Sequence, residues 1–262
     1  MFEIRRTRTR VLLQILLTVL VIPFVFPLVA MVQGSLAGQG WGNYATVLSL
    51  PLLPGFFINS AVIAASVIVL VLICTMTASF GFSKLRIRGK EIFFWALLAC
   101  LTLPGVVLLA PLFATVTRMG AYNTLWAVII PVAALQVPFT VLLARNFVDG
   151  IPDQLMEAAR VDGANILKIF WHIMLPLTRP IIAAVGVLVF INSWNEYLFP
   201  LLFLQSPEQQ TVTLVPSFFI GQYNNDQTKV LAAAVVIGLP IVIAYIFLQK
   251  YFERGLAAGA LK

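Results

Sequence analysis

Long apolar stretches constrain this chain more than any other feature of its sequence. Five or six runs of Leu, Val, Ile, Ala and Phe each approach the roughly 20 residues with which an α-helix crosses a bilayer. Hydrophobic residues make up 61% of the 262 positions and charged residues only 10%, which is more apolar surface than a soluble core buries. Period-two alternation is weak, and in lipid only helices and closed barrels pair every backbone polar group. The predicted fold class is therefore an all-α, polytopic membrane protein.

The apolar runs predict six transmembrane helices. They lie at residues 11–32, 57–81, 92–117, 125–144, 181–204 and 230–250. The first run is long and lacks a small-residue cleavage pattern, so it is interpreted as a retained anchor and not as a signal peptide. We expect a single domain over residues 1–262. Its parts are an anchor helix and outer loop over 1–55, a five-helix core over 56–252 with a cytoplasmic loop at 145–179, and a cytoplasmic tail over 253–262.

Basic residues alternate between the two sides of these spans. Fifteen of the 17 Lys and Arg residues fall in the first segment, in the loops after the second and fourth spans, and in the tail. Only Arg118 and Lys229 fall on the other side. Because cytoplasmic loops are enriched in Lys and Arg, both termini are predicted to be cytoplasmic. This orientation accounts for the net charge of +7 without a nucleic-acid partner.

The sequence carries no pattern that indicates catalysis or metal binding. His172 is the only histidine, which excludes most histidine-built metal centres. Cys74 and Cys100 fall inside apolar runs, where packing is the commoner role. No GxxxxGK[ST] phosphate loop, GxSxG elbow or HExxH helix is present. We therefore expect that this chain is not an enzyme and has no cofactor or metal of its own.

One stretch, "EAARVDGANILKIFWHIMLP" at residues 157–176, brings mixed charge into this apolar chain. Pro152 suits the first turn of a helix and Gly163 suits a left-handed cap, so a short helix is predicted over about 152–162. Asn165 is expected to cap a second helix, which the closing proline is expected to break. Two interpretations stay open. The pair lies on the inner membrane surface with its Ile and Phe side chains in lipid, or its narrow alanine surface fits another protein's groove.

The spacing in this stretch resembles the EAA loop of permeases from binding-protein-dependent ABC importers. The matching positions are Glu157, Ala158, Ala159, Gly163, Ile173, Met174, Leu175 and Pro176. Other stretches resemble the carbohydrate-uptake, maltose-type branch of this family. They are "NSAVIAA" from Asn59, "LPGVVLLAPLF" from Leu103, "YNTLWAVIIP" from Tyr122, "NSWNEYLFPLLFL" from Asn192 and "FERGLAAGALK" from Phe252. The resemblance covers most of the chain.

This resemblance implies a MetI-like permease fold in a bacterial or archaeal inner membrane. The implied partners are a second permease, two cytoplasmic ATPase subunits that bind ATP and Mg²⁺, an external substrate-binding protein and a carbohydrate. It also implies that the charged stretch is a coupling helix that fits a cleft of the ATPase. The implied contacts are Glu157, Ala158, Ala159 and Gly163, with Asp162 supporting the turn. Arg254 and Gly255 in the tail are further candidates for this contact.

The fifth span predicts a site along a substrate pathway. The stretch "FINSWNEYLFP" places Asn192, Asn195 and Glu196 on one helix face, and an ionisable residue at membrane depth indicates function. Amide and carboxylate groups match sugar hydroxyls, and Trp194 offers a flat apolar ring. Helix packing and interfacial anchoring are the alternatives. Further pathway candidates, each with a packing or loop alternative, are Asn59, Asn123 and Gln136.

Two further features complete the predicted transporter. Bends are expected in spans three and four at Pro104, Pro111, Pro131 and Pro138. The outer segment from Gln205, "QSPEQQTVTLVPSFFIGQYNND", resembles the family loop that faces the binding protein, with packing over its own bundle as the alternative.

The predicted function is ATP-driven import of a sugar or sugar-like solute by alternating access. The alternative is an ion-driven transporter or channel, which needs intramembrane charge relays beyond Glu196.

Overall fold

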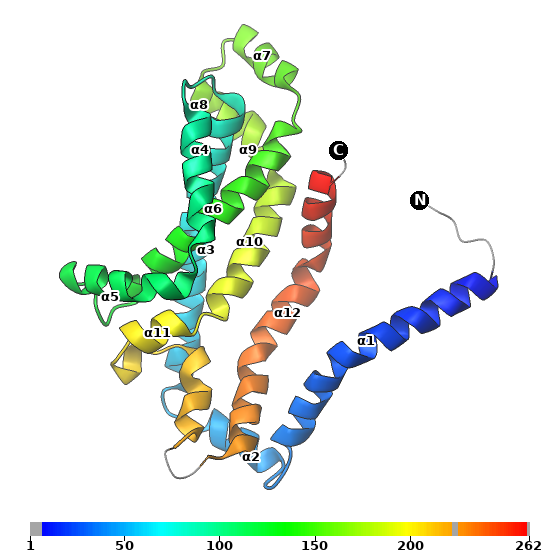
Figure 1. The fold of residues 1–262 in the computed structure, drawn as a ribbon, viewed down its shortest axis with the longest axis vertical. Helices are drawn as coiled ribbons and strands as arrows, with labels where there is room; N and C mark the ends of the chain where they lie inside the picture. Colours follow the sequence, from blue (N-terminus) through cyan, green and yellow to red (C-terminus); the bar gives the residue numbers. More distant parts are fainter. Residues whose placement is uncertain (1–6, 222–224, 261–262) are drawn as a thin grey trace. The chain divides into compact units, whose positions relative to one another are not determined.

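A computed structural model describes residues 7–221 and 225–260 of the protein, with side chains for all of these except residues 7, 8, 10, 248 and 250–260. Within these residues the chain forms helices, and the β-pairing is one isolated bridge between Ile220 and Asn225 (Figure 1). The predicted all-α class is confirmed. Arg254 and Gly255, proposed as tail contacts, lie outside the residues whose side chains are described.

Four helices are each long and apolar enough to cross a bilayer. They are α1 (Thr7–Ser35), α3 (Leu53–Lys84), α6 (Trp126–Asp149) and α12 (Gln227–Ala260) (Figure 1). They match the predicted spans one, two, four and six, and α3 and α6 continue past the predicted ends. α6 is one helix through its two prolines. Counting each of two bent helix pairs as one span brings the number to six.

The third predicted span is a bent pair and not one helix. α4 (Lys90–Ala99) and the 3-10 turn η1 (Cys100–Thr102) precede a bend of 94°, and η2 (Gly105–Leu108) with α5 (Leu109–Arg118) follows it. Pro104 lies at this bend, as predicted. A proline has no N–H to donate and forces the residue before it out of the helical conformation.

The fifth predicted span is also interrupted. α10 (Arg179–Trp194) ends ten residues before the predicted Leu204, and α11 (Leu198–Phe203) is a separate short helix. Placing Asn195 and Glu196 on a continuous helix face was therefore wrong. The physical reason is a cap, because Glu196 Oε1 accepts hydrogen bonds from the N–H groups of Leu198 (3.0 Å) and Phe199 (3.2 Å) and so begins a new helix.

The expected helix break at Pro176 is also wrong. Helical turns run on through α8 (Ile166–Ile169), the π-helical turn η3 (Phe170–Met174) and α9 (Leu175–Leu177). A π turn changes the backbone pairing just before the proline and so accommodates its missing N–H. The bend, of 73°, comes two residues after the proline, at Thr178 between this segment and α10.

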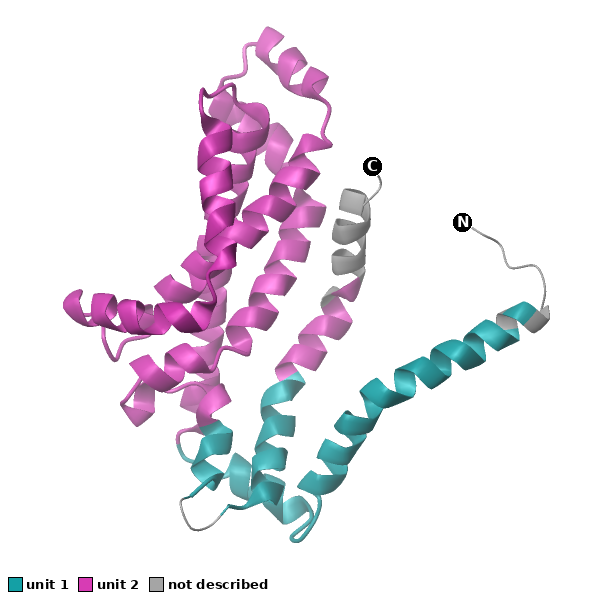
Figure 2. Ribbon diagram, viewed as in Figure 1, with its two compact units in different colours: residues 1–51, 215–239 teal, residues 52–214, 240–262 magenta. Residues whose placement is uncertain are grey.

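Backbone contacts divide the chain into two compact units (Figure 2). Unit 1 contains residues 1–51 and 215–239, and unit 2 contains residues 52–214 and 240–262. The first boundary falls near residue 56, where the core was predicted to begin. The prediction of a single domain stays a prediction.

Unit 1 contains α2 (Trp41–Leu48), a helix that the sequence did not predict. Asn43 on α2 is 1% exposed, and its Nδ2 donates to the carbonyls of Ser35 (2.9 Å) and Ala37 (2.8 Å). α1 approaches α12 closely at Gly34, where an added Cβ would lie 2.6 Å from the Leu231 side chain. One buried amide and one glycine therefore hold these three helices together.

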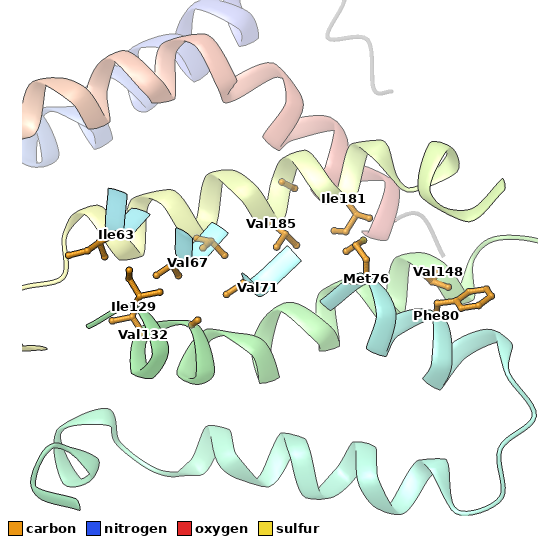
Figure 3. Packing of buried hydrophobic residues seen from close by; sticks show 14 of the residues in the cluster. Ile63, Val67, Val71, Met76, Phe80, Ile129, Val132, Val148, Ile181 and Val185 are labelled. Carbon is orange, nitrogen blue, oxygen red and sulfur yellow. The ribbon is translucent and has the colours of Figure 1, made fainter. Parts of the chain in front are cut away.

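Unit 2 is built on α3, α6 and α10, whose apolar side chains form one core (Figure 3). Most of its large apolar members come from these three helices, including Ile63, Val67, Val71, Met76, Phe80, Ile129, Val132, Val148, Ile181 and Val185. At about 1.5 Å per residue, Asn59 and Lys84 lie roughly 40 Å apart along α3. α3 therefore joins two well-separated ends of unit 2.

Candidate functional site

The predicted site residues gather at the two ends of unit 2. The basic end contains the last turns of α3 and α6, the first turn of α4, and residues 150–178. The loop end contains the first turns of α3, Asn123 between α5 and α6, the last turn of α10, and residues 195–214. Residues 205–214 include the 3-10 turn η4 (Pro207–Gln209) and the start of η5 (Val212–Phe219).

The short helix predicted over about 152–162 forms as α7 (Asp153–Val161), with Pro152 and Asp162 at its two cap positions. Gly163 has a φ of 80° and follows the helix as its left-handed cap. The N–H of Gly163 donates to the Arg160 carbonyl (3.0 Å) and that of Ala164 to the Ala159 carbonyl (2.9 Å). These two bonds define a Schellman motif, which satisfies carbonyls that a helix end otherwise leaves unpaired.

The residues of the EAA pattern do not share one environment. Glu157, Ala158, Asp162 and Gly163 are exposed, and α7 lies at the extreme end of unit 2 (Figure 1). Ala159 is only 7% exposed and packs with Met156 in the core of unit 2. The pattern therefore supplies an exposed outer surface and an inner surface that packs on the bundle.

The helical segment after α7 packs on the bundle. Asn165 caps α8, as predicted, by accepting a hydrogen bond from the Lys168 N–H (2.8 Å). Ile169 and Phe170 are buried in the core, and Phe170 packs on Phe80 of α3 with ring centroids 5.4 Å apart. Ile166, at the start of α8, is 52% exposed. Most of the apolar face is therefore covered by protein.

A group of charged residues at the basic end was not predicted. Lys84 Nζ at the end of α3 donates to the carbonyl of Ile151 (2.6 Å) and pairs with Asp153 of α7 (2.7 Å). Ser83 Oγ donates to Asp149 at the end of α6 (2.6 Å). The hydrogen bond and charge of Lys84 lower the pKa of the Asp153 carboxyl below its usual value. Sequence spacing does not pair residues that lie some 66 positions apart.

A second charged contact joins α4 to α6 at the same end. Arg145 forms two hydrogen bonds with Glu91, of 2.9 and 2.7 Å, and its guanidinium lies 4.0 Å from the centre of the Phe94 ring. A planar guanidinium group can form paired hydrogen bonds with a carboxylate and can also lie over the face of an aromatic ring. Two basic clusters that the sequence placed on one side of the membrane therefore meet at one end of unit 2.

At the loop end, the substrate-pathway candidates separate into two groups. Asn192 and Asn195 are exposed, whereas Trp194 is 6% exposed and packs against Phe57 (6.1 Å) and Phe190 (5.6 Å). The carboxylate of Glu196 is the cap of α11 described above. Packing and capping therefore account for Trp194 and Glu196.

Amide side chains hold the outer segment on the bundle. Asn59 Nδ2 donates to the carbonyls of Glu208 (2.8 Å) and Gln210 (2.9 Å). Ser60 Oγ accepts a hydrogen bond from the N–H of Val212 (3.1 Å), a residue that is fully buried. These contacts agree with the alternative interpretation of the outer segment, in which residues 205–214 pack over their own bundle.

Asn123, which lies in the loop between α5 and α6, also holds the outer segment. Its Oδ1 accepts from the N–H groups of Gln205 and Ser206, both at 2.9 Å, and its Nδ2 donates to Ser206 Oγ (2.6 Å). Its φ of 60° is tolerated by asparagine better than by most residues. Gln136 Nε2 of α6 donates to Ser193 Oγ in the last turn of α10 (3.3 Å).

The fold and these two ends define a class of protein, a polytopic helical membrane subunit that presents a capped helix beyond its bundle. Residues 76–258 match the family of binding-protein-dependent transport system inner membrane components. The chain belongs to this family, and the resemblance to carbohydrate-branch ABC importer permeases is confirmed.

Named relatives cover most of the chain. The arabinooligosaccharides transport system permease protein AraQ of Halalkalibacterium halodurans is 36% identical over 79% of this chain and 74% of the relative. The melibiose/raffinose/stachyose import permease protein MelC of Bacillus subtilis is 34% identical over 84% of this chain and 80% of the relative. The chain is also similar to one chain in the crystal structure of a bacterial ABC transporter involved in the import of the acidic polysaccharide alginate. The match covers 96% of this chain and 99% of that chain, with a TM-score of 0.80 and 24% identity. This last likeness shows the fold.

Proposed function

We propose that this chain is the membrane-spanning permease subunit of an ATP-driven importer for a sugar or sugar-like solute, working by alternating access. The family supports an importer over an ion-driven transporter or channel. The carbohydrate substrates in the names of AraQ and MelC support a sugar. Asn192 and Asn195, which are exposed, are the pathway residues that we retain for contact with the solute.

The observation that carries this proposal is the capped helix α7 at the end of unit 2. Its exposed residues Glu157, Ala158, Asp162 and Gly163 form the surface that we propose for the ATPase. Within the described residues Glu157 forms no ion pair, so its carboxylate is available to a partner. A short helix with a closed C-terminal cap and two side chains packed in the core moves as a unit. Ala159 carries that movement into the core.

The proposed assembly contains a second permease, two ATPase subunits that bind ATP and Mg²⁺, and an external substrate-binding protein. It resides in a bacterial or archaeal inner membrane with both termini cytoplasmic. The meeting of two basic clusters at one end of unit 2 supports this orientation, because that end then faces the cytoplasm as a whole.

Co-isolation tests the proposal. We expect the tagged chain to bring down its ATPase subunits, and a Gly/Ser linker in place of residues 157–163 to abolish this. Gly and Ser in place of Ile87 and Arg88, in the exposed loop between α3 and α4, are the matched control and should leave co-isolation intact. Uptake of labelled maltose, raffinose or arabinotriose by the lone chain in an ion gradient would contradict the proposal.

A further inference from the structure

The connection between α6 and α7 is a three-residue hinge at residues 150–152. An open hollow of about 250 Å³ borders it, lined by Phe147, Gly150, Ile151, Pro152, Leu155 and Leu177. Side chains therefore do not pack against this side of the hinge. Ile151 also packs against the core of unit 2, so packing supports only part of the hinge. Further contacts are needed to hold the angle between α6 and α7 on the side of the hollow.

Two neighbouring residues at the end of α3 contact both sides of this hinge. Ser83 binds Asp149, the last residue of α6, and Lys84 binds Asp153, the first residue of α7. Lys84 also binds the carbonyl of Ile151 in the middle of the hinge. These three contacts fix the positions before, within and after the hinge relative to α3.

Lys84 is the buried partner in these contacts. Its side chain is only 6% exposed, whereas that of Asp153 is 75% exposed. A nearly buried ammonium group needs acceptors for its protons, and here a carbonyl and a carboxylate supply them. Removing either acceptor leaves a charge short of partners, which resists movement of the hinge away from α3.

α3 is the helix best placed to receive a push at the hinge. It packs against both α6 and α10 in the core, and Phe80, one turn before Lys84, lies near Val148 of α6 (Figure 3). Met156 and Ala159 hold the body of α7 on the same core. The body of α7 is thus held by packing, and its hinge is held by polar contacts.

We propose that Ser83 and Lys84 form a clamp that keeps the hinge in one shape, so that α7, α6 and α3 move as one body. Lys84 is then a positioning residue for energy coupling, an inference that rests on the proposed importer function. Without the clamp, ATP-driven movement of α7 bends the hinge and reaches the bundle only in part. Arg145 joins α6 to α4 through Glu91 and also lies 3.7 Å from Asp149 on its own helix, so it contacts the residue before the hinge but does not link the hinge to α3.

The test uses the assembled complex with spin labels on α3 and α7. Cys74 is exposed on α3 and serves as one label site, Val161→Cys on α7 (88% exposed) as the other, and Cys100→Ala removes the remaining cysteine. We expect the distance between the labels to stay constant when Mg²⁺-ATP and vanadate are added. In Lys84→Met we expect it to change and its distribution to broaden. An unchanged, narrow distribution in Lys84→Met would overturn the clamp.

Transport per ATP gives the functional measure. For labelled maltose, raffinose or arabinotriose, Lys84→Met should lower the amount imported per ATP at least about fivefold, the lower end of typical coupling between sites. ATPase co-isolation should persist, Lys84→Arg should restore coupling, and the control Glu91→Gln should leave it intact. Full coupling in Lys84→Met also overturns the clamp. Failure of co-isolation in the unmutated chain refutes the importer proposal instead, and the label distances in the chain alone then still test the clamp.

Discussion

The two ends of unit 2 are held by different chemistry. At the basic end, charged groups join helices, through Lys84 with Asp153 and Arg145 with Glu91. At the loop end, the neutral amides of Asn59 and Asn123 hold backbone groups of the outer segment. Charge-assisted hydrogen bonds are stronger than neutral ones, and here they hold α7, the helix that we propose for contact with the ATPase. Neutral amides suit a loop whose backbone groups need partners, and amides so engaged are not free for a solute.

The largest effect is expected from Asn123→Ala at the loop end. The change removes three side-chain hydrogen bonds and leaves two backbone N–H groups unpaired, a loss of about 3 kcal/mol in the free energy of unfolding. Denaturant unfolding in detergent measures it. Asn123→Asp keeps both bonds to the N–H groups and should cost less. Equal losses for the two variants would show that the amide does not hold the outer segment.

Gly163→Ala should cost about 1–2 kcal/mol, because alanine is strained in the left-handed conformation even though open space surrounds this position. The matched control is Gly81→Ala in α3, where space is also open and φ is ordinary for a helix. There alanine should be neutral or stabilising. Protease cleavage after Arg160, compared between the two variants, reports the local loss. Equal protease sensitivity in the two variants would show that the left-handed cap at Gly163 does not make α7 rigid.

Asn59→Ala should have a smaller effect, about 1 kcal/mol, and a local one. Hydrogen exchange should accelerate in residues 207–212, which Asn59 and Ser60 hold. Asn192→Ala, at an exposed position, should leave that exchange unchanged and should instead alter solute uptake. If Asn59→Ala instead altered solute uptake and left the exchange of residues 207–212 unchanged, Asn59 would belong to the substrate pathway.

The smallest effect is expected from pH. The pKa of Asp153 is lowered in the folded state, so its contribution is complete above the pKa of an unfolded aspartate and is lost as the pH falls through the lowered value. Label distances between α3 and α7 should therefore broaden only at strongly acidic pH, and Asp153→Asn should broaden them at neutral pH. Contacts of Asn59 and Asn123 should not respond, because amides do not titrate. A broadening near neutral pH would point to another group.

Much of this architecture was predictable from local patterns. The four continuous apolar helices follow from run length, and the caps at Gly163 and Asn165 follow from residue types that tolerate those conformations. Pro104 marked a real bend. The prediction failed where a polar side chain pairs with backbone groups, near or far in the chain. Glu196 looked like a membrane carboxylate and is a helix cap, and the polar candidate Asn59 proved to hold a loop some 150 residues away.

The sequence by itself determined that this chain is a helical membrane protein, that it belongs with importer permeases, and that a short capped helix follows the fourth span. Each of these depends on periodicity, spacing or the intrinsic preference of single residues. Tertiary structure alone decided which side of that helix faces outward and that Lys84 binds across its hinge. Such choices depend on which groups, far apart in the chain, come within hydrogen-bonding distance once the apolar core of α3, α6 and α10 is packed.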